Sequence, residues 1–295
     1  MRQIPPQSLV TIRERKPQFP ITDELADYLN RLCLPRGVAT IMHTVMPDTF
    51  EVFYKIPPNG KGTREMQELK PDMRIDMIGP LGQPFNVRRL VDGGVPEVHV
   101  IGGGVGMAPL VYLVQSLRFC SVPVKAFIGI ESLDHLRYRL RHGRQDIQDE
   151  QLDQIHAAGG KDIHIYVDDL LQTGVERDNM YVSYDRPGDL RGIVPPGNHM
   201  QGVISDLYGR HLKSHAPGKR ITVFACGPTP MMQAIHEMIQ PNEGMKTYVL
   251  MEKRMACGIG VCLSCVCRTR TGTGGYSRVC KEGPVFDADE ILWHE

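Results

Sequence analysis

Five of the eight cysteines lie within residues 257–280, and their spacing is the strongest chemical signal in the chain. The pattern C-x4-C-x2-C, followed at a distance by one more cysteine, is the plant-type spacing for a [2Fe–2S] cluster. Zinc is the alternative, but zinc ribbons favour two short C-x2-C knuckles and this segment has one. Gly258 and Gly260 would let the backbone wrap closely around a cluster. Cys267 would alternate along a strand, and we leave it as a non-ligand. The predicted ligands are Cys257, Cys262, Cys265 and Cys280.

Two segments place glycines where a predicted strand meets a predicted helix: VIGGGVGMAPL at 100–110 and FACGPTPMM at 224–232. Glycines let a pyrophosphate approach the backbone, and a helix N-terminus offers free N–H groups. Ligands of open α/β sheets bind beyond the carboxyl ends of strands, so the two segments predict both halves of a nicotinamide nucleotide site. The alternatives are a tight βα turn and, for Cys226, a small buried thiol. The predicted contacts are Gly102, Gly103, Gly104, Gly106, Cys226, Gly227, Pro228 and Met231.

Two further features of the sequence give weaker evidence for cofactor binding. In the sequence GKGT at 60–63, Gly62 and Thr63 open a predicted helix at 63–69 and would bind a flavin diphosphate, or form a turn with a capping threonine. Glu131 directly follows a predicted strand, where a carboxylate accepts from ribose hydroxyls and repels a 2′-phosphate. It favours NAD over NADP, unless it is a solvated glutamate.

The elements that must position these residues divide the chain into three predicted domains. Short alternating runs at 8–15, 38–46, 49–56 and 74–79 indicate a small antiparallel β-barrel over 1–95, interrupted by a helix at 22–34. Residues 96–245 alternate apolar strands with helices, which is typical of a parallel sheet in an α/β domain. The strands are expected at 97–103, 124–130, 163–168 and 221–227, and the helices at 107–118, 133–158, 200–213 and 229–239. A long inserted loop is expected at 170–198, with a small cluster domain at 246–295.

Composition excludes some classes of function. The chain has 34 Lys+Arg and 34 Asp+Glu, so its formal net charge of zero gives no support to nucleic-acid binding. No run of 18 or more apolar residues is present, which predicts no membrane span. The N-terminal sequence lacks a signal-peptide pattern, so we expect a cytoplasmic protein.

Several motifs together resemble those of the electron transfer subunit family of dihydroorotate dehydrogenase B. They are GPLGQPF (79–85), GGGVGMAPL (102–110), CGPTPMM (226–232), MEKRMACGIGVCLSCVC (251–267) and VCKEGPVFDADEI (279–291). The resemblance runs from about residue 36 to the C-terminus. It implies a ferredoxin-reductase-like flavoprotein with an FAD-binding β-barrel, an NAD-binding α/β domain and a C-terminal [2Fe–2S] domain. It also implies the same four cysteine ligands.

The resemblance implies three FAD-contacting segments: an Arg-Pro-x-Ser motif, an aromatic-bearing strand and a Gly-Thr pair. The motif reads Arg36-Gly37-Val38-Ala39 here, so only its arginine is kept, with Thr40 one position late to supply a hydroxyl. The implied contacts are Arg36, Val38, Ala39, Thr40, Phe53, Tyr54, Lys55, Gly62 and Thr63.

The resulting prediction is an NAD-linked electron transfer subunit of a hetero-oligomer. Hydride carries an electron pair and the cluster accepts one electron at a time, so FAD must divide the pair. No catalytic acid or base is predicted. The expected partner is a flavin-containing, dihydroorotate-oxidising subunit. One alternative is the equivalent subunit of a sulfite reductase, a sulfhydrogenase or an electron-bifurcating NADH–ferredoxin complex. Another is a non-enzymatic iron–sulfur redox sensor that has lost FAD.

Overall fold

The computed structural model of the chain describes residues 8–13, 39–41, 49–54, 61–66, 68–69, 73, 81–94, 97–132, 166–186, 193–214, 218 and 220–293. Its centre is a seven-stranded sheet in the order β12-β9-β8-β4-β5-β6-β7. The strands are β4 (Val98–Gly103), β5 (Val124–Ile130), β6 (Met180–Tyr184), β7 (His199–Gln201), β8 (Ile221–Cys226), β9 (Met245–Leu250) and β12 (Val285–Asp287). All pair in parallel except β12, which is antiparallel to β9. This sheet confirms the predicted parallel core.

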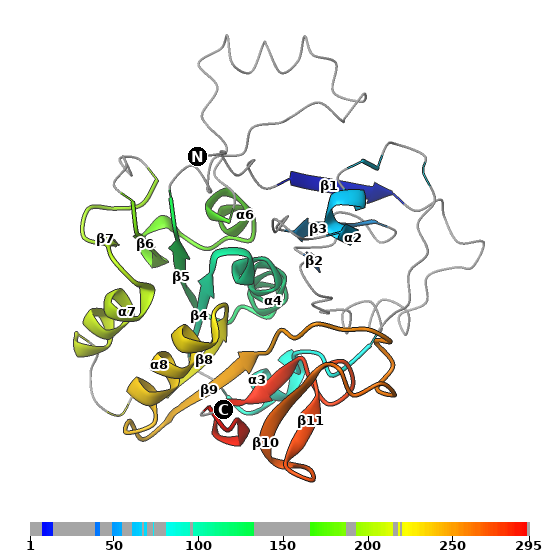
Figure 1. The fold of residues 1–295 in the computed structure, drawn as a ribbon. Helices are drawn as coiled ribbons and strands as arrows, with labels where there is room; N and C mark the ends of the chain where they lie inside the picture. The colour runs from blue at the N-terminus through cyan, green and yellow to red at the C-terminus, as the bar shows by residue number, and fades with distance from the viewer. Residues whose placement is uncertain are drawn as a thin grey trace, which may run out of the picture.

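Helices cover both faces of this sheet (Figure 1). The first face carries α3 (Val87–Asp92), α4 (Met107–Phe119) and α6 (Val167–Gln172), and the second carries α7 (Ile204–Lys213) and α8 (Thr229–Ile239). Three short 3₁₀ turns complete the domain: η1 (Gly104–Gly106), η3 (Arg177–Asn179) and η4 (Ala288–Glu290). Because both faces are covered, the central strands are mostly apolar, and β8 is buried at every residue.

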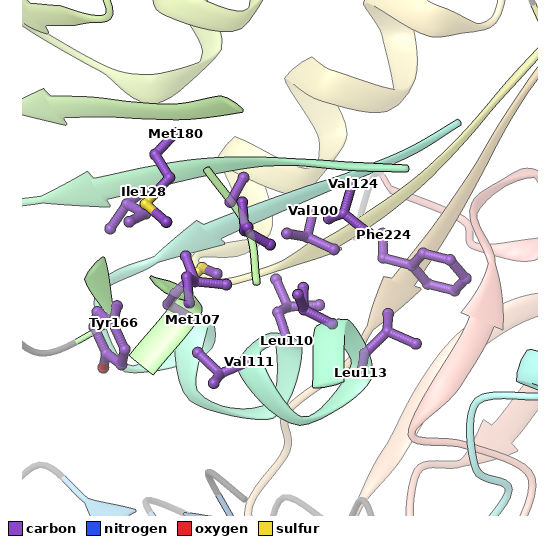
Figure 2. Close-up of a cluster of buried hydrophobic side chains, with 14 of the residues drawn as sticks. Val100, Met107, Leu110, Val111, Leu113, Val124, Ile128, Tyr166, Met180 and Phe224 are labelled. Atoms are coloured by element: carbon purple, nitrogen blue, oxygen red, sulfur yellow. The ribbon is translucent and has the colours of Figure 1, made fainter. Parts of the chain in front are cut away.

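The core on the first face forms between α4 and the strands beneath it (Figure 2). Leu110 and Leu113 of the helix lie toward Val100 and Val124 of β4 and β5, and all four side chains are buried. The helix starts directly after η1, so this packing fixes the direction in which the glycine turn leaves β4. The sheet and α4 therefore hold the end of β4 rigidly.

A second, three-stranded antiparallel sheet has the order β1-β3-β2 and lies beside α4, with α2 (Lys61–Met66) next to it (Figure 1). Its strands are β1 (Ser8–Arg13), β2 (Ala39–Ile41) and β3 (Thr49–Tyr54), which match three of the predicted runs. The predicted strand at 74–79 and the predicted helix at 22–34 lie outside the described residues.

The C-terminal segment is connected to the large sheet. The hairpin of β10 (Val266–Thr273) and β11 (Tyr276–Arg278) forms a separate two-stranded sheet, and β12 then returns to pair with β9. Strand β9 spans the predicted domain boundary at 245/246. The cysteine segment therefore lies between two strands that belong to one sheet.

Two predictions about residues 163–198 are wrong. Residues 167–172 form helix α6, whose N-terminus is held by the Tyr166 backbone N–H donating to Asp169 Oδ2 at 2.8 Å, so the predicted strand does not run to 168. The predicted loop at 170–198 contains β6, which is the third parallel strand. Met180 and Val182 of β6 are buried on the first face of the sheet. This strand has five residues between proline- and glycine-rich stretches, which explains why its pattern was missed.

The remaining predicted elements hold with small shifts. Helix α4 extends to 119, α7 begins at 204 rather than 200, and α8 spans 229–239 as predicted. The predicted helix at 133–158 lies outside the described residues. Within the described part of the chain, no helix has the length and apolar character needed to cross a membrane.

Candidate functional site

The four predicted cluster cysteines meet as two pairs, three of them in the loop between β9 and β10 and Cys280 just after β11. The backbone N–H of Cys262 donates to Cys257 Sγ at 3.4 Å, and that of Cys280 donates to Cys265 Sγ at 3.5 Å. Val279 N also donates to the Cys265 carbonyl at 2.9 Å, which fixes the second pair. Gly258 and Gly260 take positive φ angles of 71° and 82°, so the loop turns tightly as predicted.

The thiols of the two pairs differ in environment. Cys262 is exposed, and hydrogen bonds from Ser264 and the Cys257 backbone lower the pKa of its thiol to about 6. Backbone N–H groups, that of Cys262 first, lower the pKa of Cys257. Burial and the neighbouring Cys265 raise the pKa of Cys280 to about 11. The thiolate is the form of cysteine that binds a metal ion. The lowered pKa values of Cys257 and Cys262, the outer pair, therefore favour the metal-binding form.

Cys267 makes a contact outside these two pairs. Its buried Sγ lies 3.6 Å from the Ser277 carbonyl across the β10–β11 hairpin. Among the described residues, no three His, Cys, Asp or Glu side chains are grouped around the position of a single metal ion. A two-iron cluster with four cysteine ligands takes two cysteines at each iron, and the observed pairs fit that requirement.

The glycines at the two strand ends fall into two groups. Four pack against protein atoms so closely that any side chain would overlap a neighbour; these are Gly102, Gly103, Gly106 and Gly227. A Cβ on Gly106, for instance, would lie 2.4 Å from the carbonyl oxygen of Cys226. Gly104 differs, because its φ is +56° and no atom of the described residues lies within 4 Å of a Cβ built there. Among these five glycines, Gly104 is therefore the one whose surroundings in the described structure leave room for a ligand beside the backbone.

The two strand ends lie side by side. β4 and β8 are neighbours in the sheet, and Gly102 pairs with Cys226 in register. Chain connections diverge here, since β5 lies on one side of β4 and β8 on the other, which makes this crevice a topological switch point. Pro228 precedes the first turn of α8, and Met231 in that turn packs against Gly103. The structure therefore brings together the residues predicted from both segments.

Glu131 lies at the same edge, directly after β5, and it has a cationic partner. Arg186, two residues beyond β6, donates from Nη2 to Glu131 Oε1 at 2.8 Å. Both side chains are exposed. Glu131 is therefore part of an ion pair rather than a solitary solvated group.

The predicted flavin-contacting residues include buried hydroxyls without partners. Phe53 and Tyr54 on β3 are fully buried, and Thr63 in α2 is buried. The Tyr54 hydroxyl and Thr63 Oγ1 have no hydrogen-bond partner among the described residues. A Cβ on Gly62 would meet nothing within 4 Å in the described structure. Buried polar groups in proteins are nearly always hydrogen-bonded, so these residues fit a bound polar group such as FAD.

Tyr166 packs against β3 of the smaller sheet and was not singled out in the sequence analysis. Tyr166 is fully buried with φ of +69°, and its ring contacts Phe53 edge-on at 5.4 Å between centroids. Burial, then Asp169 and Cys226, raise the pKa of its hydroxyl, which also has no hydrogen-bond partner among the described residues. Strained residues of this kind concentrate at functional sites. Cys226 is fully buried, and burial and Glu252 raise the pKa of its thiol.

Glu252 lies two residues beyond the end of β9, next to β8. Its Oε1 is enclosed and has no hydrogen-bond partner within the described part of the chain. Burial raises the pKa of this carboxyl to about 6. Enclosed, unpartnered atoms on Glu252 and Tyr166 therefore flank the end of β8, which is one of the two strand ends predicted to form the nucleotide site.

Comparison with known proteins identifies the family of the chain. Residues 252–292 match the family model described as the iron-sulfur cluster binding domain of dihydroorotate dehydrogenase B. The dihydroorotate dehydrogenase B (NAD(+)) electron transfer subunit of Clostridium acetobutylicum is 31% identical over 236 residues, covering 80% of this chain and 72% of that protein. The chain belongs to this electron transfer subunit family. The Bacillus velezensis subunit of the same name is 30% identical, covering 92% of this chain and 83% of that protein.

The fold of this family member is also found in a solved structure. A chain from the NADH-dependent reduced ferredoxin-NADP oxidoreductase matches with a TM-score of 0.57 and 20% identity, covering 88% of this chain and 80% of that one. At this identity the likeness supports the fold, namely a parallel-sheet α/β core with the further elements described above.

Some predicted site residues lie outside the described structure. Arg36, Val38 and Lys55 are among them, and Ala39 and Thr40 are described only as part of the backbone of β2. Sequence reasoning missed Tyr166, Arg186 and Glu252. Tyr166 and Arg186 lie in the segment whose elements were misassigned, and Glu252 lies in a stretch for which only the cysteines were considered.

Proposed function

We propose that the chain passes electrons between NAD(H), FAD and a [2Fe–2S] cluster, to or from a flavin-containing catalytic subunit of the dihydroorotate dehydrogenase type. The observation that carries the proposal is the meeting of four cysteines as two pairs, in the segment that matches the iron–sulfur family model. The proposed ligands are Cys257 and Cys262 for one iron and Cys265 and Cys280 for the other.

The loop that holds the outer pair also supports a partner surface. Three apolar residues lie between the cysteines of this loop. They are Ile259, Val261 and Leu263, and they are 55%, 73% and 60% exposed. Exposed apolar side chains gathered in one loop mark protein-interaction sites. A partner subunit docked on this loop would bring its own redox centre close to the exposed Cys262. This loop is therefore the proposed contact of a hetero-oligomer.

The proposed flavin site lies at β3 and α2, within a β-barrel of which β1, β2 and β3 form the described part. Thr63 and Tyr54 would donate their otherwise unpartnered hydroxyls, and the open space at Gly62 would admit the diphosphate. Phe53 supports this wall by packing on Tyr166. Arg36, Val38, Ala39, Thr40 and Lys55 are the further proposed contacts. When bound there, FAD would exchange a hydride with the nicotinamide and exchange single electrons with the cluster.

NAD(H) is proposed to bind across the ends of β4 and β8. Gly104 admits the pyrophosphate, while the packed glycines hold the two strand ends close enough to share one ligand. Cys226, Gly227 and Pro228 would contact the nicotinamide half, and Glu131 would accept from a ribose hydroxyl. Tyr166 lies between this edge and β3, which is where the nicotinamide must face the flavin.

The proposal includes the domain division 1–95, 96–245 and 246–295 and a cytoplasmic location. The described cysteines are free thiols, and a cluster with cysteine ligands needs them reduced. The cytoplasm keeps thiols in that state.

Anaerobic purification followed by ultraviolet–visible spectroscopy, with iron and flavin quantified per chain, tests the proposal. We expect flavin and [2Fe–2S] bands together, and bleaching of both on addition of NADH. Cluster bands alone, even after reconstitution with FAD and partner, would support the redox-sensor alternative. Co-expression with a dihydroorotate dehydrogenase catalytic subunit should yield a complex that reduces NAD with dihydroorotate. A flavin- and cluster-loaded chain that forms no such complex would indicate one of the other partners.

A further inference from the structure

We propose that Arg186 is a second determinant of nucleotide choice that opposes Glu131, so that this site accepts the 2′-phosphate of NADP(H) far better than Glu131 alone would allow. The inference rests on the proposed function, because it assumes that a nicotinamide nucleotide binds across the ends of β4 and β8. It adds the class of nucleotide and a residue with a specific role.

The backbone holds the two residues in fixed positions. The Asp185 N–H donates to the Ile130 carbonyl at 3.2 Å, and the Arg186 N–H donates to the Glu131 carbonyl at 3.0 Å. These bonds join the segments that directly follow β5 and β6, whose register ends at the pair Ile130 and Tyr184. Arg186 is therefore anchored opposite Glu131 at the carboxyl edge of the sheet, although its side chain is 71% exposed.

The pair lies where the adenosine ribose is expected. β5 is the neighbour of β4, and Gly103 pairs with Gly129, two residues before Glu131. A nucleotide with its pyrophosphate at Gly104 and its nicotinamide toward β8 must extend its adenosine half in the other direction, over β5. The ribose 2′-position then faces the Glu131–Arg186 pair.

The chemistry of the pair suits either nucleotide. With NAD(H), the 2′-hydroxyl donates to the Glu131 carboxylate while Arg186 neutralises its charge. With NADP(H), the planar guanidinium has five N–H donors, so it can bind phosphate oxygens and still hold Glu131. Without Arg186, the carboxylate would face the phosphate as an uncompensated like charge. The two residues should therefore act in opposite directions on one preference.

Equilibrium binding of NAD⁺ and NADP⁺ to the flavin- and cluster-loaded protein, by isothermal titration calorimetry, tests this. The variants are Arg186→Met, Glu131→Gln and the double variant. Arg186→Met should weaken NADP⁺ binding by roughly tenfold or more, the effect of losing a charge-assisted hydrogen bond, and change NAD⁺ binding about twofold or less. Glu131→Gln should strengthen NADP⁺ binding and weaken NAD⁺ binding. In the double variant the gain in NADP⁺ binding should disappear.

Arg210→Met is the matched control. Arg210 is exposed in the last turn of α7, a helix whose packing directs that turn away from the carboxyl edge, and its loss should leave both affinities unchanged. Raising the salt concentration should reduce the effect of Arg186→Met, because the pair is exposed. Equal losses for both nucleotides, or no loss for NADP⁺, would refute the role of Arg186. Failure of the wild-type protein to bind either nucleotide would instead refute the proposed function.

Discussion

The two glycines that begin and end η1 give the sharpest test of the proposed nucleotide site, because their surroundings in the structure differ. Gly106 packs against backbone: a Cβ there would lie 2.4 Å from the Cys226 carbonyl oxygen and 2.8 Å from the Gly227 nitrogen. Gly104 has a φ of +56° but open surroundings in the described structure. Gly106→Ala should therefore damage folding, whereas Gly104→Ala should damage ligand binding.

The magnitudes follow from these contacts. Overpacking of a tight interior costs about 1–3 kcal/mol, and for Gly106→Ala we expect the upper end, about 3 kcal/mol, because the atoms that must move belong to backbone. Gly104→Ala carries only the cost of a left-handed alanine, about 1–2 kcal/mol. Its methyl group would, however, occupy the space through which the pyrophosphate reaches the backbone. We expect at least a roughly tenfold loss of NAD(H) affinity, equivalent to about 1.4 kcal/mol.

Gly218→Ala separates backbone strain from ligand exclusion. Gly218 has a φ of +82° with no atom of the described residues within 4 Å of a Cβ, so the substitution imposes similar strain away from the strand ends. Urea unfolding would give the free energy of unfolding of each variant, and calorimetry the NAD⁺ affinity. The reasoning fails if Gly104→Ala binds NAD⁺ as well as Gly218→Ala does, or if Gly106→Ala is as stable as Gly104→Ala.

Three further predictions concern the other centres. Cys280→Ala should abolish the [2Fe–2S] signal in the electron paramagnetic resonance spectrum of the reduced protein, and Cys267→Ala should preserve it; the reverse result would refute the ligand assignment. Gly62→Val should release FAD while the iron content per chain stays constant, since the branched side chain fills the space left for the diphosphate; full flavin retention would place FAD elsewhere. Burial raises the pKa of Glu252 to about 6 from 4.5, so the folded state retains a proton that the unfolded chain releases. Stability attributable to this group is therefore lost as the pH rises through 4.5 to 6, by about 2 kcal/mol at pH 8. Glu252→Gln should recover much of that loss at pH 8 and little at pH 4.5, as measured by urea unfolding; an equal gain at both pH values would contradict the titration.

The parts of the site that could be predicted from sequence are those encoded by local spacing. The cysteine spacing alone predicts a [2Fe–2S] cluster, because the spacing of the ligands reflects how one loop wraps around a cluster. The glycines at 102–106 and 227 were also recognised from the sequence as a feature of two strand ends. The structure shows that most of them allow close packing of the backbone. Local patterns are read well because the interacting residues are near in sequence.

The parts that were missed depend on contacts between distant segments. Arg186 meets Glu131 across 55 positions, and only the register of β5 and β6 brings them together. Tyr166 gains its significance from burial against Phe53 and from its positive φ, neither of which has a sequence signature. The short strand β6 was read as loop because five residues are too few to show a pattern between prolines and glycines.

The large sheet connects the proposed nucleotide site with the proposed cluster site. Cys226 at the end of β8 pairs with Leu250 at the end of β9, so the nicotinamide end of the proposed site lies one strand away from the segment that leads to Cys257. Leu250 in turn pairs with Val285 of β12, and the Met251 N–H donates to the Pro284 carbonyl at 2.9 Å. Both segments that carry cluster cysteines are thereby anchored to β9. Any change that frees β12 from β9 should loosen Cys280 relative to the other ligands while leaving the strand ends at Gly104 intact. The large sheet thus supports both the proposed cluster site and the proposed nucleotide site, and we expect that one site can be disrupted while the other stays intact.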